Sequence, residues 1–157
     1  MLQPKRVKHR KMHRIKYEGP TKGNGYIAYG EFGIASNDGA WITDRQIEAA
    51  RVAISRHLGK TGKMFIRIFP QMSKTKKPLE VRMGSGKGNP EFWVAVVKKG
   101  TIMFEVAGIS KEEAQKAFYA AGNKLPVTWT FIEKGEDKHD IKYGLPPKNR
   151  PRINRYC

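Results

Sequence analysis

The stretch FWVAVVKKGTIMFEV, residues 92–106, decides the fold expected for this chain. Phe92–Lys98 and Thr101–Val106 are apolar, β-branched and aromatic, which is typical of central strands. The Lys99-Gly100 pair between them favours a tight turn, because glycine adopts left-handed backbone conformations without strain. The sequence therefore predicts a β-hairpin within the sheet.

Two amphipathic helices are expected on either side of this hairpin. Downstream, Ser110 and Glu113 form a capping box, and Gly122 stands where the helix should stop. Upstream, Thr43 can cap a helix that Gly59 ends. Apolar residues recur at helical spacing in both segments: Ile47, Ala50, Ile54 and Leu58 in the first, and Ala114, Ala117, Phe118 and Ala121 in the second.

Further strands are expected upstream and downstream. Lys63–Phe69 is a largely apolar run in which aliphatic Met64, Ile66 and Ile68 take alternate positions, and Pro70 closes it. In Pro126–Glu133, Val127, Trp129 and Phe131 alternate with the residues between them. In residues 25–35, glycines interrupt an aromatic and aliphatic run, which suggests a short, bent strand pair. Two helices packed on an antiparallel or mixed β-sheet make residues 26–133 one α+β domain.

Positive charge is separated from this predicted core. The 157 residues include 31 Lys and Arg against 14 Asp and Glu, a formal net charge of +17. Residues 1–25 hold eight of these cations against one acid, and residues 71–90 hold five against one. Such blocks are stabilised beside a polyanion, where each neutralised phosphate releases a counterion. We therefore expect a basic N-terminal arm (1–25), a basic Gly-rich loop (71–90) and a basic, Pro-rich C-terminal extension (134–157).

Several classes of function lack support in the sequence. Cys157 is the only cysteine, so neither an intrachain disulfide nor a thiolate metal cluster is expected, and a reducing cytoplasm is the predicted location. No apolar run reaches the length of a membrane span. His9 and His13 lie four apart but have no third ligand nearby. We predict no metal, no cofactor, no small-molecule substrate and no membrane partner.

The segment Gly84–Gly88 suggests a phosphate-binding loop and, with it, an alternative function. A free-standing RNA-modifying or phosphate-handling enzyme would place its active site there. The nucleotide-binding pattern fails, because Val81 stands where it needs glycine and Gly88 stands where it needs Ser or Thr. The segment is otherwise a flexible surface loop or a thin basic finger that offers Arg82 and Lys87 to phosphates or base edges.

Charged and aromatic side chains elsewhere in the sequence have structural or functional interpretations. The outer face of the first helix, with Arg45 and Arg51, is either solvated or in contact with phosphates. Asp44 and Glu48 are expected to serve the helix start and surface ion pairs. Trp93 and Trp129 are expected in the core. Trp41, in the predicted turn before the helix, suits core packing and base stacking equally.

A colinear set of short matches then resembles a known family. The stretches are Met1–Arg6, Arg45–Arg51, Arg67–Pro70, Lys77–Leu79, Val81–Gly84, Gly86–Gly88 and Lys124–Pro126. They resemble the bacterial type of large-subunit ribosomal protein sixteen, and they follow the family's order over residues 1–133. The resemblance implies an α+β fold with a β-hammerhead motif, no enzymatic activity, and a cytoplasmic ribosome as the location.

The resemblance also implies partners. These are large-subunit ribosomal RNA near the aminoacyl-tRNA site, neighbouring ribosomal proteins, and tRNA in the aminoacyl site, with peptidyl-site tRNA as a second candidate. Together with the charge pattern it gives the predicted rRNA-binding residues Gln3, Lys5, Arg6, Lys8, Arg10, Lys11, Arg14, Lys16, Arg45 and Arg51. The residues expected to face tRNA and the peptidyl-transferase region are Lys77, Arg82, Met83, Gly84, Gly86, Lys87 and Gly88.

Overall fold

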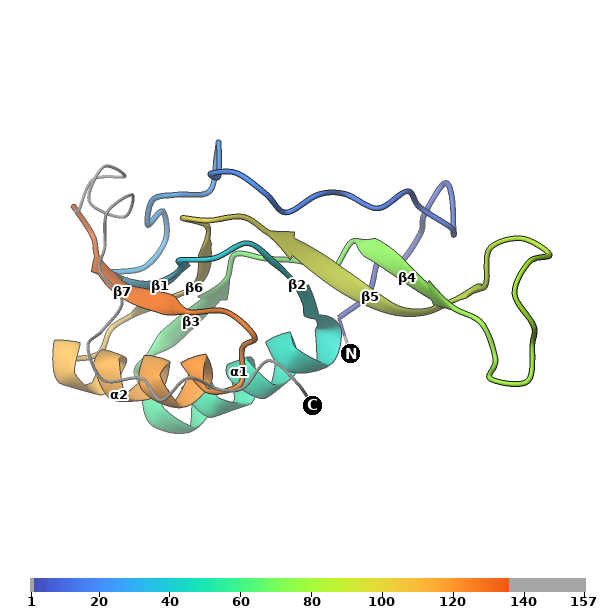
Figure 1. Ribbon diagram of the computed structural model, residues 1–157. Helices are drawn as coiled ribbons and strands as arrows, with labels where there is room; N and C mark the ends of the chain where they lie inside the picture. The colour runs from blue at the N-terminus through green and yellow to red at the C-terminus, as the bar shows by residue number, and fades with distance from the viewer. Residues whose placement is uncertain (1, 136–157) are drawn as a thin grey trace.

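The computed structural model describes residues 2–135, and over these residues two helices and seven strands form two antiparallel sheets (Figure 1). The predicted α+β class is confirmed. Of the predicted C-terminal extension 134–157, all but the first two residues lie outside the described part of the chain.

A four-stranded sheet packs on both helices. Its strand order is β3 (Lys63–Ile66), β6 (Ile102–Ala107), β1 (Phe32–Ser36) and β7 (Trp129–Glu133). The helices α1 (Asp44–Leu58) and α2 (Lys111–Gly122) lie side by side beneath it in Figure 1. Phe104 and Phe118 are fully buried in the core between these layers.

A three-stranded sheet extends away from this core. Its order is β2 (Ala40–Thr43), β5 (Asn89–Val97) and β4 (Met72–Lys76). Ile42 pairs with Ala95, and Met72 pairs with Val94. Beyond the core, β4 and β5 continue as a narrow ribbon joined by residues 77–88, which we call the finger loop (Figure 1, right). The sheet therefore holds the finger loop at a distance from the helices.

Both helices begin as the sequence predicts. The Thr43 hydroxyl accepts a hydrogen bond from the Gln46 N–H, and the Gln46 side chain accepts one from the Thr43 N–H. Ser110 and Glu113 form the same reciprocal box at α2. The predicted apolar residues of both helices are all buried. The structure therefore confirms the helices, their caps and their core-facing sides.

The predicted hairpin of residues 92–106 is wrong. The turn is present, with a φ of 81° at Gly100, but β5 and β6 join different sheets. The Gly100 N–H donates to the Ser36 carbonyl oxygen at 2.7 Å, and the Ser36 N–H donates to that of Thr101 at 2.9 Å. Each strand has neighbours on both sides that come from distant parts of the sequence, and these displace the local partner.

Three smaller expectations also differ from the structure. Residues 25–35 contain one strand, β1, because the backbone before it binds a buried side chain instead of a second strand. β4 lies inside the range expected to be loop, which shortens the loop to residues 77–88. Trp41 lies in β2 rather than in a turn. The strands expected at Lys63–Phe69 and Pro126–Glu133 are confirmed as the shorter β3 and β7.

Candidate nucleic-acid interface

The N-terminal arm lies along the three-stranded sheet and is held there through its backbone (Figure 1). The Ser73 hydroxyl donates to the Arg10 carbonyl oxygen at 2.7 Å. The Trp41 Nε1–H donates to the Ile15 carbonyl oxygen at 3.0 Å, and the Ile15 N–H donates to the Met72 sulfur at 3.4 Å. Because the sheet binds main-chain atoms, these contacts leave the cationic side chains of the arm available to a partner.

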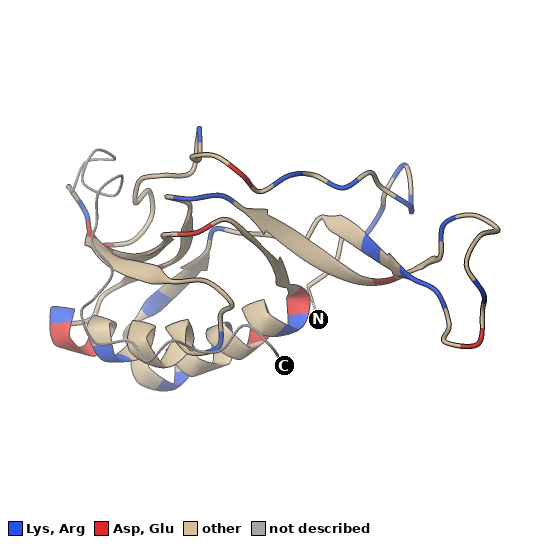
Figure 2. Cartoon of the chain, viewed as in Figure 1, with Lys and Arg blue, Asp and Glu red and all other residues tan. Residues whose placement is uncertain are grey.

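The predicted rRNA-binding residues of the arm are all exposed, and Figure 2 shows Lys and Arg following the arm and the finger loop. They are Gln3, Lys5, Arg6, Lys8, Arg10, Lys11, Arg14 and Lys16. Over residues 2–25 the arm therefore presents a row of positive charge along the outside of the sheet.

Two lysines join the arm to the finger loop. The Lys11 ammonium donates to the Lys87 carbonyl oxygen at 2.9 Å, and the Lys87 ammonium donates to the carbonyl oxygen of Met12. Lys87, which the sequence assigns to the tRNA-facing loop, therefore lies against the arm. The arm and the finger loop, which carry most of the rRNA-binding and tRNA-facing residues predicted from the sequence, are therefore in contact at Lys11 and Lys87.

The finger loop has an unusual backbone at its tip. Gly84, Ser85 and Gly86 have φ angles of 96°, 55° and 86°, three consecutive residues in the left-handed region that favours glycine. The Lys77 ammonium donates to the Gly84 carbonyl oxygen, which closes the loop on itself. At the base, a Cβ on Gly88 would lie 2.5 Å from the Lys76 carbonyl oxygen, so only glycine fits against β4.

The finger loop directs side chains into solvent. Arg82 is exposed, the Met83 side chain is 100% exposed, and that of Leu79 is 97% exposed. The predicted Arg82 and Met83 therefore lie where a bound macromolecule can reach them.

Trp41 lies between the arm and β4. The Lys74 ammonium lies 3.9 Å from the centroid of the Trp41 ring, and Tyr17 meets the ring edge-on at 5.4 Å between centroids. Partial burial and the positive charge of Arg14 lower the pKa of Lys74. Trp41 thus packs against side chains of this protein, and the base-stacking interpretation receives no support.

The two predicted arginines of α1 differ. Arg51 forms an ion pair with Glu48, with 2.6 Å between Nη2 and Oε1 and 2.9 Å between Nε and Oε2. These hydrogen bonds lower the pKa of Glu48 and raise that of Arg51. Arg45 is exposed beside the helix start. The expected surface pairing of Glu48 is confirmed, and Arg45 is the α1 arginine more open to a phosphate.

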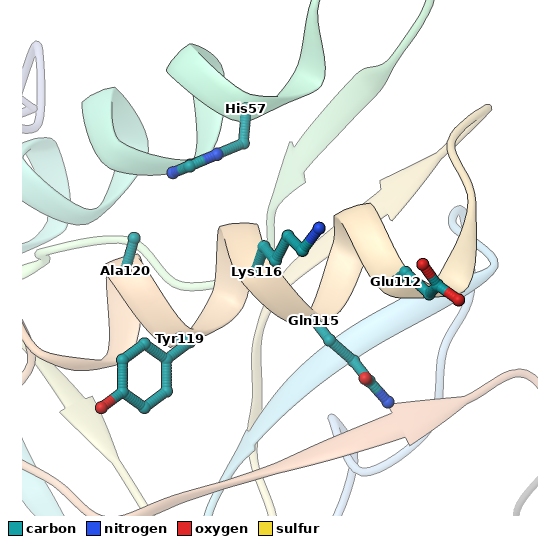
Figure 3. A pocket seen from close by; sticks show the side chains of 6 residues that line it. All are labelled: His57, Glu112, Gln115, Lys116, Tyr119 and Ala120. Carbon is teal, nitrogen blue, oxygen red and sulfur yellow. The ribbon is translucent and has the colours of Figure 1, made fainter.

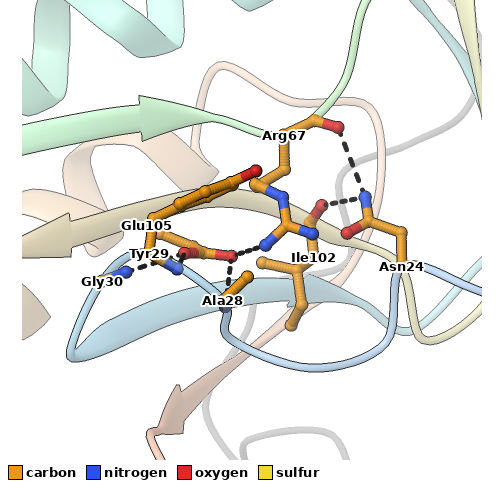
Figure 4. Close-up of polar contacts among 7 residues, drawn as sticks. All are labelled: Asn24, Ala28, Tyr29, Gly30, Arg67, Ile102 and Glu105. Carbon is orange, nitrogen blue, oxygen red and sulfur yellow. Dashed lines mark hydrogen bonds and ion pairs between the residues drawn. The ribbon is translucent and has the colours of Figure 1, made fainter.

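A buried carboxylate that the sequence did not reveal fixes the segment between the arm and β1 (Figure 4). Glu105 is fully buried in β6 and accepts hydrogen bonds from the N–H groups of Tyr29 at 2.7 Å and Gly30 at 2.8 Å. Arg67 completes the network with an ion pair and lies 5.1 Å from the Tyr29 ring. The sequence did offer one signal, since Glu105 is a single acid within an apolar strand. Its hydrogen-bond partners could not be identified, because they lie 38 or more residues away in the chain.

The helices carry an open pocket between them (Figure 3). His57 of α1 faces α2 across it, and the α2 side chains lining it are Glu112, Gln115, Lys116, Tyr119 and Ala120. Within residues 2–135 there is no group of three or more His, Cys, Asp and Glu side chains that could hold a metal ion. No helix of that part is long and apolar enough to cross a membrane.

Fold and interface together define a class of protein: a compact α+β core whose basic extensions are suited to a nucleic acid. The family model described as "Ribosomal protein L16p/L10e" matches residues 4–132. "Large ribosomal subunit protein uL16" of Mycoplasma genitalium is 69% identical over 137 residues, which cover 87% of this chain and 99% of that protein. The protein of the same name from Malacoplasma penetrans is 65% identical over 140 residues, which cover 89% of this chain and 100% of the relative.

The chain belongs to the L16p/L10e family of ribosomal proteins. This confirms the resemblance seen in the sequence. The family consists of structural proteins, so this chain is not an enzyme, and the alternative of an active site at Gly84–Gly88 is wrong. The family match ends at residue 132, before the predicted C-terminal extension.

Proposed function

We propose that this protein, as a structural constituent of the large ribosomal subunit, binds large-subunit ribosomal RNA through its arm and contacts aminoacyl-site tRNA through its finger loop. The names of its relatives support the subunit. The location that follows from this family is the cytoplasmic ribosome. Neighbouring ribosomal proteins are further partners, and peptidyl-site tRNA is a second ligand for the finger loop.

One observation carries the rRNA part of this proposal: the arm is fixed by its backbone while its cations remain exposed. An arm that is already ordered loses less conformational entropy on binding than a free chain loses. Its Lys and Arg side chains neutralise phosphates and release counterions, which supplies affinity without reading sequence. The arm thus positions the protein on RNA by shape and charge.

The finger loop supports the tRNA part. Arg82 is exposed beside a loop tip held by Lys77, and the ribbon of β4 and β5 carries it away from the core. A guanidinium group binds a phosphate through two parallel hydrogen bonds, which fixes direction as well as charge. In this proposal Arg82 steadies the tRNA, and no covalent bond is made or broken.

Fractionation of a cell extract tests the rRNA part. At moderate salt the protein should sediment with large ribosomal subunits, and it should leave them only at high ionic strength, because salt weakens phosphate contacts. A protein found mostly free at moderate salt would contradict the proposal.

Substitution of Arg82 by alanine tests the tRNA part. We expect Arg82→Ala to weaken aminoacyl-tRNA binding to ribosomes about tenfold, as for the loss of one charge-assisted hydrogen-bonded contact. The thermal midpoint of the free protein should not change, because Arg82 is exposed. Lys60→Ala, an exposed cation just after α1, is the matched control and should leave tRNA binding intact. A large loss of stability in Arg82→Ala would instead show that Arg82 supports the fold.

A further inference from the structure

Two cations, Arg14 and Lys74, lie near enough to influence each other where the arm meets β4. Lys74 lies in β4, two residues after Met72. Arg14 directly precedes Ile15, whose N–H and carbonyl oxygen are bound by Met72 and Trp41. The main chain beside Arg14 is therefore anchored at Trp41, the residue over whose ring the Lys74 ammonium lies.

This arrangement is unfavourable in the free protein. Desolvation and the positive charge of Arg14 both lower the pKa of Lys74. The ion pairs found within residues 2–135 include neither Arg14 nor Lys74, so no carboxylate of the described chain compensates the repulsion. The Trp41 ring, 3.9 Å from the Lys74 ammonium, offers only the weaker attraction of a π face.

We infer that Arg14 and Lys74 together bind one phosphate group of ribosomal RNA, over the Trp41 ring. This inference rests on the proposed function and names a contact within it. An anion between the two groups would convert their repulsion into two attractions. A polynucleotide is the favoured source of the phosphate, because exposed Lys11 and Lys16 continue the cationic row along the arm on either side of Arg14. Lys74 and Trp41 are absent from the rRNA-binding set that the sequence predicts.

The salt dependence of binding tests this inference, because its slope counts neutralised phosphates. The assay uses the full chain and large ribosomal subunits from which this protein has been stripped at high salt. The variants are Arg14→Gln, Lys74→Met and the double variant. Methionine retains an unbranched stem over Trp41 and removes the charge.

A shared phosphate predicts a non-additive result. Either single variant keeps one cation at the phosphate, so the slope of log K against log salt should stay near the wild-type value. The double variant should lose about 0.7 to 0.9 of slope, the contribution of one phosphate. An unchanged slope in the double variant, or a loss of about twice that size, would overturn the inference.

Lys76→Met is the matched control on the same strand. Lys76 is exposed and lies 3.8 Å from Glu91, so this variant should leave the slope unchanged. A loss equal to that of the double variant would overturn the inference, because any β4 cation would then have the same effect. If binding of the wild-type protein did not depend on salt, the proposed function itself would be contradicted. A salt-dependent wild-type protein with an unchanged slope in the double variant would contradict only the shared phosphate site.

The stability of the free protein gives a second readout. Lys74→Met should leave the thermal midpoint unchanged or raise it, because the variant removes a like-charge repulsion while keeping the ring covered. A clear fall in the midpoint would make Lys74 a structural residue and would count against a phosphate site.

Discussion

Glu105 attaches residues 28–30, the segment between the arm and β1, to the four-stranded sheet. Its buried carboxylate binds three consecutive N–H groups, those of Ala28, Tyr29 and Gly30, and the guanidinium of Arg67 (Figure 4). Gly30 permits this approach, because a Cβ there would lie 2.7 Å from the Val106 carbonyl oxygen. The carboxylate therefore replaces a strand partner for this segment.

Removal of the Glu105 carboxylate should destabilise the protein strongly. Glu105→Ala leaves the guanidinium of Arg67 and three N–H groups without their acceptor, and we expect a loss of about 3–5 kcal/mol in the free energy of unfolding. Urea unfolding of the full chain measures this change in the free energy of unfolding.

The matched control is Glu91→Ala, which removes an exposed carboxylate and should cost no more than about 1 kcal/mol. Equal effects of the two substitutions would show that the Glu105 network contributes little to stability.

The capping boxes of the two helices are alike in geometry and different in chemistry. At α2, hydrogen bonds from the Ser110 hydroxyl at 2.9 Å and N–H at 3.2 Å lower the pKa of Glu113 below its ordinary value of 4.5. At α1, the corresponding side chain is the amide of Gln46, which does not titrate. A depressed folded-state pKa gives stability that is present above the unfolded-state pKa and lost as the pH falls through the folded-state value.

The cost of removing the α2 cap should therefore depend on pH. Ser110→Ala should reduce stability more at pH 7 than at a pH below the lowered folded-state pKa of Glu113, where Glu113 is protonated in both variants. Thr43→Ala is the matched control, with a loss of about 1 kcal/mol at both pH values. Urea midpoints at the two pH values give the comparison, and a Ser110→Ala loss that is the same at both would contradict the role assigned to Glu113.

Local signals made the helices predictable, and distant pairing made the sheets hard to predict. Caps and apolar spacing lie within a few residues of Thr43 and Ser110, so the sequence identified both helices. The partners of β6 come from residues 32–35 and 63–66, which a local hairpin signal at Gly100 does not reveal. β4 escaped detection because Met72–Lys76 is short and largely polar.

The sequence predicted which segments of the candidate interface are basic, but it did not predict how they are arranged in space. The arm and the Gly-rich loop stood out as basic blocks, and their exposure agrees with that expectation. The contacts between Lys11 and Lys87, or between Lys74 and Trp41, join residues far apart in the sequence. Only the folded chain shows that the arm and the finger loop touch.

At the scale of the whole molecule, positive charge and apolar packing occupy different places. The core of both sheets and both helices is apolar, whereas the arm and the finger loop carry the excess of Lys and Arg (Figure 2). This separation leaves the Lys and Arg side chains of the extensions outside the packed core, where a partner can reach them. The central claim is that these extensions bind ribosomal RNA by neutralising its phosphates.

The most direct test of that claim is the salt dependence of binding to stripped large subunits for two triple variants. The first variant replaces the exposed arm cations Lys5, Arg6 and Lys8 with glutamine. The second replaces three exposed cations in or near the helices, Lys60, Lys116 and Lys124, with glutamine in the same way. We predict that the arm variant loses about 0.7 to 0.9 of slope for each phosphate released, while the helix-side variant keeps the wild-type slope. Equal slopes for the arm variant and the wild-type protein would contradict the account.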